Sequence, residues 1–467
     1  MDRMTPLDAA FWTLENEHAS LHIAAVSVFE GPMPSYAEVA GRYTNRIATM
    51  PRYRQRMRTV PFGLGWPVWV DAPDFDLEYH LRSTGLPRPG GAVELETLIG
   101  RLMSTPLDRN RPLWEAWLVD GLSDERWALV TKVHHSLADG LAGMDLFTHV
   151  LDPMPGAGPQ HPLGRPAPPQ RPPGRPRLLA GAVAAGLASG RQAARDVVAA
   201  GRHPATAVRA AGAGVRGSLG YARALRPFSS SSLAGPIGGS RRYRTAVVDR
   251  DDIAIVRRAF GGSLNDVALA IVTHGFRELL LSRGEEPGAH TVRTLVPVSV
   301  RAPHEEHDLA NKVSAILLDL PVDFGDPVAA HGAVVARMRE LKQHHEADAG
   351  VLATELAGLL PAGAVAPALR AAFAVPQRVL TTVVTNVPGP PRPVHLLGRR
   401  MLALYPYVPI ADRIRVGVAL TSYDDRLFFG ITCDRESVPD GDVLSAGIEA
   451  GLAALVKAAD TTEGSPS

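Results

Sequence analysis

Cysteine, lysine and long apolar runs are scarce in this chain of 467 residues. Cys433 is the one cysteine, which excludes an internal disulfide and any metal or iron–sulfur site that needs several cysteine ligands. The longest uncharged apolar run, Leu178 to Gly190, is well short of the ~18 residues that a membrane span requires. We therefore expect a protein of a reducing compartment that does not cross a bilayer.

The first residues also lack the apolar core of a secretory signal, because Asp2, Arg3 and Asp8 interrupt the segment from Met1 to Trp12. Hydrophobic residues make up 45% of the chain and charged residues 21%, which is typical of a globular protein. The length allows two or three domains with a substantial buried core.

A formal net charge of +1 conceals one strongly basic segment. Between Pro155 and Arg244, fourteen arginines accompany a single acid, Asp196, and arginines recur every seven residues from Arg195 to Arg223. This pattern predicts either a basic helix that lies on an anionic lipid surface or a linker helix that packs on the protein's own acidic surface, and both remain open. Because aromatic residues are not interleaved with the arginines, we do not expect nucleic acid as a partner.

Proline-rich sequence separates two α/β halves. The patterns of His22 to Phe29 and Arg126 to His134 predict strands, and a helix is expected from Tyr36 to Met50. Ten prolines between Pro153 and Pro176 predict a linker. The expected organisation is an N-terminal domain at 1–152, a linker with a basic amphipathic helical segment at 153–242, a C-terminal domain at 243–460 and a disordered tail at 461–467.

The second half repeats the alternation of strands and helices. Strands are expected at Arg244 to Asp249, Thr291 to Val300, Ser314 to Leu320, Val379 to Thr385, Val416 to Thr421 and Leu427 to Cys433. Helices are expected at Asp251 to Phe260, Asn265 to Leu281, Asp326 to His344 and Asp442 to Ala458. Two α/β domains of comparable size follow from this pattern.

The segment with the most chemical content is His134-His135-Ser136-Leu137-Ala138-Asp139-Gly140, at the exit of an expected strand. Successive side chains of a strand point to opposite faces, so one of His134 and His135 is the reactive candidate and the other belongs to the framework. A neutral imidazole can take a proton from an alcohol while the alcohol attacks an activated acyl group, and no serine or cysteine nucleophile is then needed. Asp139 is expected either to face the histidine or to anchor the loop, and Gly140 permits a tight turn.

Two satisfied framework histidines at the end of a strand are the alternative interpretation of this motif. Elsewhere, His344 and His345 lie in a polar helical run, and His304 and His307 lie among acidic loop residues, so we expect solvated surface rather than a metal site there. The chain contains no Gly-x-Ser-x-Gly elbow, no Walker-type phosphate loop and no Gly-x-Gly-x-x-Gly after a strand. These absences argue against serine hydrolases and nucleotide-binding enzymes.

Other motifs lie before and after the histidine pair in an ordered series. They are Thr5 to Phe11 with Glu15, Pro106 to Asp108, Pro112 to Glu115, Ser263 to Asp266, Val296 to Arg301, Thr385 to Pro390 and Ser422 to Asp424. With the histidine motif, this series resembles the bacterial wax ester synthase/acyl-CoA:diacylglycerol acyltransferase family, which is related to chloramphenicol-acetyltransferase-like enzymes and condensation domains. The resemblance extends from about Met4 to Lys457. Ala310 departs from it, because the family usually has glycine there.

The resemblance implies that His135 is the general base, with His134 and Gly140 beside it in the motif. Asp139 resembles the family's structural aspartate, and Arg301 is its candidate partner. The other candidates, which bind substrate or support the site, are Asn265, Asp266, Thr385, Asn386, Glu15 and Trp114. Among these, Thr385 and Asn386 are candidates for contact with the thioester oxyanion, Trp114 is more often a core aromatic, and the role of Asn265 and Asp266 stays open.

By the same resemblance, two chloramphenicol-acetyltransferase-like α/β domains enclose a central tunnel with His135 at its middle. The implied enzyme is a diacylglycerol O-acyltransferase or a long-chain-alcohol O-fatty-acyltransferase. It transfers a long-chain acyl group from acyl-CoA to diacylglycerol or a long-chain alcohol and makes triacylglycerol or wax ester. No cofactor is expected besides the co-substrate acyl-CoA, because the thioester is already activated.

Such substrates imply a cytoplasmic protein attached peripherally to the inner face of the plasma membrane or to lipid droplets. The expected contacts are the basic segment and the apolar stretch from Leu352 to Phe373. Two alternatives stay open: an acyltransferase that acts on a smaller or more polar alcohol, and a catalytically silent protein that binds lipid droplets.

Overall fold

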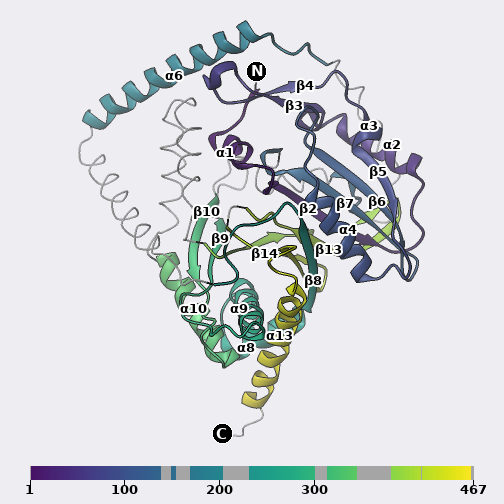
Figure 1. Ribbon diagram of the computed structural model, residues 1–467, viewed down its shortest axis with the longest axis vertical. Helices are drawn as coiled ribbons and strands as arrows, with labels where there is room; N and C mark the ends of the chain where they lie inside the picture. Colours follow the sequence, from purple (N-terminus) through teal and green to yellow (C-terminus); the bar gives the residue numbers. More distant parts are fainter. Residues whose placement is uncertain are drawn as a thin grey trace.

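The computed structural model describes residues 2–137, 149–153, 169–202, 231–299, 313–343, 380–411 and 413–463. Two six-stranded sheets with associated helices form the body of the molecule, and a smaller three-stranded sheet lies near the N-terminus (Figure 1). The α/β fold class expected from the sequence is confirmed. The central tunnel stays a prediction.

The N-terminal sheet has the strand order β12-β13-β2-β7-β6-β5. Its strands are β2 (His22–Phe29), β5 (Leu81–Gly85), β6 (Trp114–Leu122), β7 (Arg126–His134), β12 (His395–Leu396) and β13 (Arg399–Tyr407). Strand β5 runs parallel to β6, whereas β13, β2, β7 and β6 pair in antiparallel fashion. The predicted limits of β2 and β7 are confirmed, and nearly all their side chains are buried in the N-terminal core.

Helices and short turns surround this sheet. They are α1 (Pro6–Leu14), α2 (Tyr36–Ile47), η1 (Pro51–Arg54), η2 (Pro61–Gly63), α3 (Leu77–His80), α4 (Ala92–Ser104) and η3 (His135–Leu137). Helix α2 begins with a capping box, in which Ser35 and Glu38 exchange hydrogen bonds between side chain and backbone. The helix predicted from Tyr36 therefore begins where expected, and it ends slightly earlier than Met50.

The C-terminal sheet has the order β10-β9-β11-β14-β15-β8. Its strands are β8 (Arg241–Asp249), β9 (Arg293–Ser299), β10 (Val313–Asp319), β11 (Thr382–Pro388), β14 (Val416–Tyr423) and β15 (Arg426–Asp434). Its helices are α8 (Arg250–Phe260), α9 (Leu264–Ser282), α10 (Pro327–Gln343) and α13 (Gly441–Glu463). Each corresponds to an element predicted from the sequence, with ends shifted by a few residues, and the helices share one apolar core with the sheet.

Strands β12 and β13 come from the second half of the chain but complete the N-terminal sheet. Strand β13 pairs with β2 from Met401 opposite Phe29 to Tyr407 opposite Ala24. These two strands were not predicted from the sequence. The two sheets therefore do not correspond to two continuous stretches of chain, and the expected domain boundaries stay a prediction.

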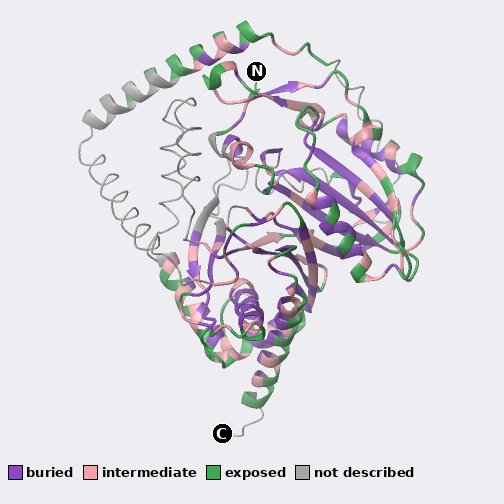
Figure 2. Cartoon of the chain, in the orientation of Figure 1, coloured by how far each residue is buried: buried purple, intermediate pink, exposed green. Residues whose placement is uncertain are grey.

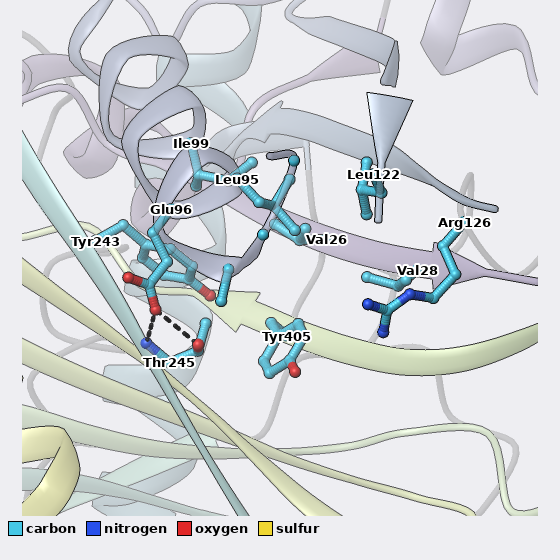
Figure 3. Close-up of a pocket in the computed structure, with 13 residues that line it drawn as sticks. Val26, Val28, Leu95, Glu96, Ile99, Leu122, Arg126, Tyr243, Thr245 and Tyr405 are labelled. Carbon is cyan, nitrogen blue, oxygen red and sulfur yellow. Dashed lines mark hydrogen bonds between the residues drawn. The ribbon is translucent and has the colours of Figure 1, made fainter. Parts of the chain in front are cut away.

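Buried polar contacts join the two sheets where α4 meets β8 (Figure 3). The Glu96 carboxylate accepts hydrogen bonds from the backbone N–H and the hydroxyl of Thr245, at 2.8 and 2.7 Å, and from Nη1 of Arg244 at 3.2 Å. Burial raises the pKa of Glu96, and the bonds from Thr245 and Arg244 only partly oppose that shift. Glu96 therefore connects α4 of the N-terminal half to β8 of the C-terminal sheet.

Two cavities lie at or next to this junction. One of about 90 Å³ is lined by Val26, Glu96 and Tyr405 among others, and a larger one of about 440 Å³ shares Tyr405 and lies beside Arg400 and Arg426. Neither His134 nor His135 is among the lining residues of these two cavities.

Helix α6 (Arg175–Arg202) crosses the outside of the molecule (Figure 1). Near its start, Leu178 packs against Val68 and Val70 of the small sheet, whose strands are β1 (Asp2–Arg3), β3 (Gln55–Arg58) and β4 (Val68–Asp71). Most other described side chains of α6 are exposed (Figure 2). The helix lies in the segment for which a basic helix is expected, and the continuation to Arg226 lies outside the described residues. Within the described ranges, no helix is long and apolar enough to span a membrane.

Candidate active site

Strand β7 ends at His134, and His135 begins the short turn η3 that follows; the backbone of each is anchored by a hydrogen bond. His134 lies opposite His22 of β2 in the antiparallel register. The N–H of His134 donates to the carbonyl oxygen of Leu113, and the N–H of His135 donates to that of Leu21, both at 2.9 Å. The sheet therefore holds the origin of both side chains in place.

The two imidazoles have separate surroundings. His134 is fully buried, with Trp12 and His22 against its edge at ring-centroid distances of 5.9 and 5.7 Å. The His135 ring stacks on Phe11 of α1 at 3.9 Å, and the residue keeps part of its surface accessible. Of the two residues, His134 is the more deeply buried.

A buried carboxylate, Glu15, lies behind this pair. Its Oε2 accepts hydrogen bonds from Nε and Nη2 of Arg109 at 3.1 and 2.7 Å, and its Oε1 accepts one from the backbone N–H of Leu21 at 3.2 Å. Nε2 of His22 lies 3.0 Å from Oε1, and Nε2 of His134 lies 3.5 Å from Oε2. Glu15 therefore connects the end of α1 with both histidine-bearing strands.

The charge on Glu15 is strongly stabilised. Burial by itself favours the neutral acid, but the hydrogen bonds and charges of His134 and His22 outweigh burial and lower the pKa of Glu15 far below its ordinary value. Glu15 is thus ionised at neutral pH. The Arg109 guanidinium, which also lies 4.1 Å from the centre of the Trp12 ring, supplies the permanent opposite charge.

Hydrogen bonding also defines the tautomer of His134. Its Nδ1 accepts the backbone N–H of Ser136 at 3.1 Å and lies 2.7 Å from the Ser136 hydroxyl. Since Nδ1 is an acceptor, the proton of the neutral ring is on Nε2, the nitrogen that faces Glu15. His134 is therefore held at Nδ1 by Ser136, with Nε2 3.5 Å from the Glu15 carboxylate.

His135 is a neutral base at physiological pH. Burial lowers its pKa to about 4, its own backbone group opposes that shift, and the neighbouring His134 adds to it. Its Nδ1 is enclosed and has no hydrogen-bond partner among the described residues. An uncharged ring of this kind can accept a proton without first losing one.

Trp114 supports β7 from the core. It is fully buried, its Nε1 donates to the carbonyl oxygen of Tyr53 at 2.8 Å, and its ring stacks on His80 at 4.7 Å. In the sheet it lies opposite Val133, the residue before His134. These contacts are those of a core aromatic.

The motifs of the C-terminal half fall into a capping residue and a polar pair. Oδ2 of Asp266 accepts hydrogen bonds from the N–H and hydroxyl of Ser263, and the Asp266 N–H donates to the same hydroxyl, which forms the capping box of α9. Nδ2 of Asn386 donates to Oδ1 of Asn265 at 3.5 Å. Thr385, adjacent in β11, is half-buried. No described contact links these residues to His135.

Three candidates, Asp139, Gly140 and Arg301, lie outside the described residues. In contrast, the structure adds His22 and Arg109, which the sequence analysis did not select. His22 could have been found, because it opens the strand that pairs with β7; Arg109 lies in a loop directly after the Pro106 to Asp108 motif. Within the described ranges, no group of three or more His, Cys, Asp and Glu side chains could hold a metal ion.

The arrangement of two α/β sheets, with an imidazole at the end of a strand, places the protein in the chloramphenicol-acetyltransferase-like class. The first condensation domain of the CDA synthetase shares this fold, with a TM-score of 0.57, 17% identity, and coverage of 98% of this chain and 96% of that domain. The wax ester synthase/diacylglycerol acyltransferase from Marinobacter aquaeolei VT8 is more similar, with a TM-score of 0.70, 27% identity, and coverage of 98% and 100%.

Sequence comparison then gives the family. Residues 4–268 match the wax ester synthase/diacylglycerol acyltransferase catalytic domain, and residues 309–456 match the C-terminal domain of that family. A putative diacylglycerol O-acyltransferase of Mycobacterium bovis and the probable diacylglycerol O-acyltransferase tgs1 of Mycobacterium tuberculosis are each 39% identical over 98% of this chain and 96% of their own length. The chain belongs to the wax ester synthase/diacylglycerol acyltransferase family, and the resemblance seen in the sequence is confirmed.

Proposed function

We propose that this acyltransferase transfers a long-chain acyl group from acyl-CoA to the hydroxyl of diacylglycerol or a long-chain alcohol, with His135 as general base. The observation that carries the proposal is His135 itself, a neutral base at the end of β7 whose neighbour His134 lies 3.5 Å from the ionised Glu15. The names of the mycobacterial and Marinobacter relatives support the choice of acceptors.

The reaction needs one base and an activated acyl group. With Nδ1 enclosed, Nε2 of His135 takes the proton of the acceptor hydroxyl while the hydroxyl oxygen attacks the thioester carbonyl carbon. The tetrahedral intermediate collapses, its carbon–sulfur bond breaks, and the CoA thiolate takes the proton from the imidazolium. The products are an ester and free CoA, and the ring returns to its neutral form.

Replacement of the base tests the proposal. We expect His135→Ala to lower the rate of esterification by about 10²- to 10⁴-fold, measured with palmitoyl-CoA and a panel of diacylglycerol, hexadecanol and short alcohols. His18→Ala is the matched control, because His18 is an exposed histidine beside α1. Full esterification by His135→Ala would contradict the proposal, and thiol release that needs no acceptor indicates a thioesterase. A preference for short alcohols indicates the smaller-acceptor alternative.

The pKa of His135 predicts the pH dependence of the reaction. Because the base works as the neutral ring and its pKa is about 4, kcat/KM is expected to stay level from about pH 5 to 8 and to fall as pH drops through about 4. An acid limb centred near 6.5, the ordinary value for histidine, would show that the reactive group is not this buried ring.

We also propose that the protein works at a lipid surface without crossing it. Both acyl partners are lipids, and α6 contributes five arginines and one acid to the basic segment. The apolar stretch from Leu352 to Phe373 lies outside the described residues and stays a prediction. Salt-sensitive adsorption to anionic vesicles, lost on deletion of Arg177 to Arg226, is the expected result; binding that ignores both salt and the deletion argues against it.

A further inference from the structure

The connection between β3 and β4 presents apolar side chains to solvent on a strained backbone. Phe62, within η2, is 87% exposed and has φ 60° and ψ 11°, the left-handed region that side chains other than those of glycine and asparagine seldom adopt. Leu64, two residues on, is 54% exposed. Neither strain nor exposure of an aromatic ring stabilises the folded chain, which suggests that these side chains serve a contact outside it.

Helix α6 extends this apolar surface. A Cβ built at Gly65 would lie 2.9 Å from the Cβ of Ala182, so the β3–β4 tip and the helix are in direct contact. Val183 follows Ala182 and is 57% exposed, and Leu187, one helical turn later, is 60% exposed. We call Phe62, Leu64, Val183 and Leu187 the tip–helix patch.

Arginines border the tip–helix patch. Arg191 and Arg195 continue the four-residue spacing of Val183 and Leu187 along α6, and both are exposed. At the other side, the guanidinium of Arg3 reaches the tip, with Nη1 3.1 Å from the position of a Cβ at Gly65. Apolar side chains between cationic ones match a lipid interface, where acyl chains lie beneath anionic phosphates.

We propose that the tip–helix patch docks on an anionic bilayer, with Phe62 and Leu64 inserted between the headgroups and α6 lying along the surface. This inference rests on the proposed function, to which it adds the residues that contact the lipid. A second copy of the chain is a poor occupant, because a symmetric contact through this patch brings the arginines of both copies together. An anionic bilayer neutralises them instead.

The test measures partition of the full chain, without substrate, onto vesicles of phosphatidylcholine with and without phosphatidylglycerol. Phe62→Gly is expected to weaken partition onto the anionic vesicles by about tenfold, because one buried aromatic side chain is lost from the contact. The same variant should keep or raise the Tm, since glycine adopts a φ of 60° without strain. Arg191→Glu with Arg195→Glu should weaken partition and flatten its salt dependence.

Val93→Ser is the matched control, because Val93 on α4 is an equally exposed apolar residue, 63% accessible, outside the patch. It should leave partition unchanged. Equal partition of the wild type and Phe62→Gly overturns the proposal, as does an equal loss in Val93→Ser, or a dimer that Phe62→Gly dissociates while vesicle binding persists.

The outcome is separate from that of the proposed reaction. If the protein partitions onto vesicles in a Phe62-dependent manner but makes no ester, the proposed reaction is wrong and the proposed docking surface is supported. If the protein acylates a soluble alcohol but does not partition onto vesicles, the proposed docking surface is wrong and acyl transfer is supported.

Discussion

Two glutamates with buried carboxylates hold different parts of the molecule together, and their pKa values move in opposite directions. Glu15 lies behind the histidine pair and accepts bonds from Arg109 and Leu21, with His22 and His134 beside it. Glu96 lies at the junction of α4 with β8, with Thr245 and Arg244 as donors. Burial opposes ionisation at both sites, but the pKa of Glu15 is lowered and that of Glu96 is raised.

The difference lies in the partners rather than in depth. Two imidazoles direct nitrogen atoms at Glu15, and their hydrogen bonds and charges outweigh its burial. At Glu96, a hydroxyl, a backbone amide and one arginine do not offset the cost of burial. The ionised Glu15 can orient His134, the neighbour of the proposed base His135, whereas the carboxyl of Glu96 joins α4 to β8.

Removal of Glu15 should have the largest effect. Glu15→Ala removes the carboxylate that the buried His22 and His134 face and leaves the exposed Arg109 to solvent, so we expect a loss of about 3 kcal/mol in the free energy of unfolding. Misplacement of the histidine pair should also lower kcat by about 10²-fold in the molecules that remain folded. Denaturant melts and steady-state kinetics measure the two effects. Glu17→Ala, at an exposed neighbour, should change neither the free energy of unfolding nor kcat. If Glu15→Ala also changes neither, the role given to Glu15 is wrong.

Glu96→Ala should have a smaller effect, confined to stability. Loss of its bonds to Thr245 and Arg244 is expected to lower the free energy of unfolding by about 1–3 kcal/mol. The kcat of the folded enzyme should not change, because the described contacts do not link Glu96 to His135. A kcat loss comparable to that of Glu15→Ala would show that the junction and the active site are coupled.

The pH dependence of stability should distinguish the two sites most finely. The lowered pKa of Glu15 means that its ionised form stabilises the fold above the ordinary carboxyl pKa of 4.5, and that this contribution is lost as pH falls. The raised pKa of Glu96 means that the fold loses stability as pH rises through 4.5. The free energy of unfolding, measured from pH 3 to 7, should be lower in each variant than in the wild type. This difference should grow with pH in Glu15→Gln and shrink with pH in Glu96→Gln, by at most about 1.4 kcal/mol per pH unit. If the free energy of unfolding changed with pH in the same way in both variants, the opposite pKa shifts of Glu15 and Glu96 would be wrong.

Local sequence pattern predicted much of the fold. His22 to Phe29 and Arg126 to His134 were placed correctly because alternation and β-branching act within a strand. Strand β13 was missed because its role depends on pairing with β2, hundreds of residues away in the chain. Strand β13 also packs closely on β15. A side chain at Gly430 would collide with the carbonyl oxygen of Pro406, so only glycine fits at that position.

The candidate site shows the same division. The motifs selected His135 and Glu15, but nothing in their spacing indicates that the two belong to one buried cluster with His22 and Arg109. Asp266 caps its own helix through bonds to Ser263, a local pattern that the sequence contains. The contact of Asn265 with Asn386, in contrast, joins a helix to a strand and depends on the packed sheet.

The chain by itself determined the α/β class, the strand that ends in two histidines, and the excess of arginine on one helix, because these features depend on residues close together in sequence. Tertiary structure decided which histidine is fully buried, which carboxylate stays ionised, and which apolar side chains remain in solvent. Those properties depend on burial and on partners brought from distant positions, and both exist only once the sheets have packed.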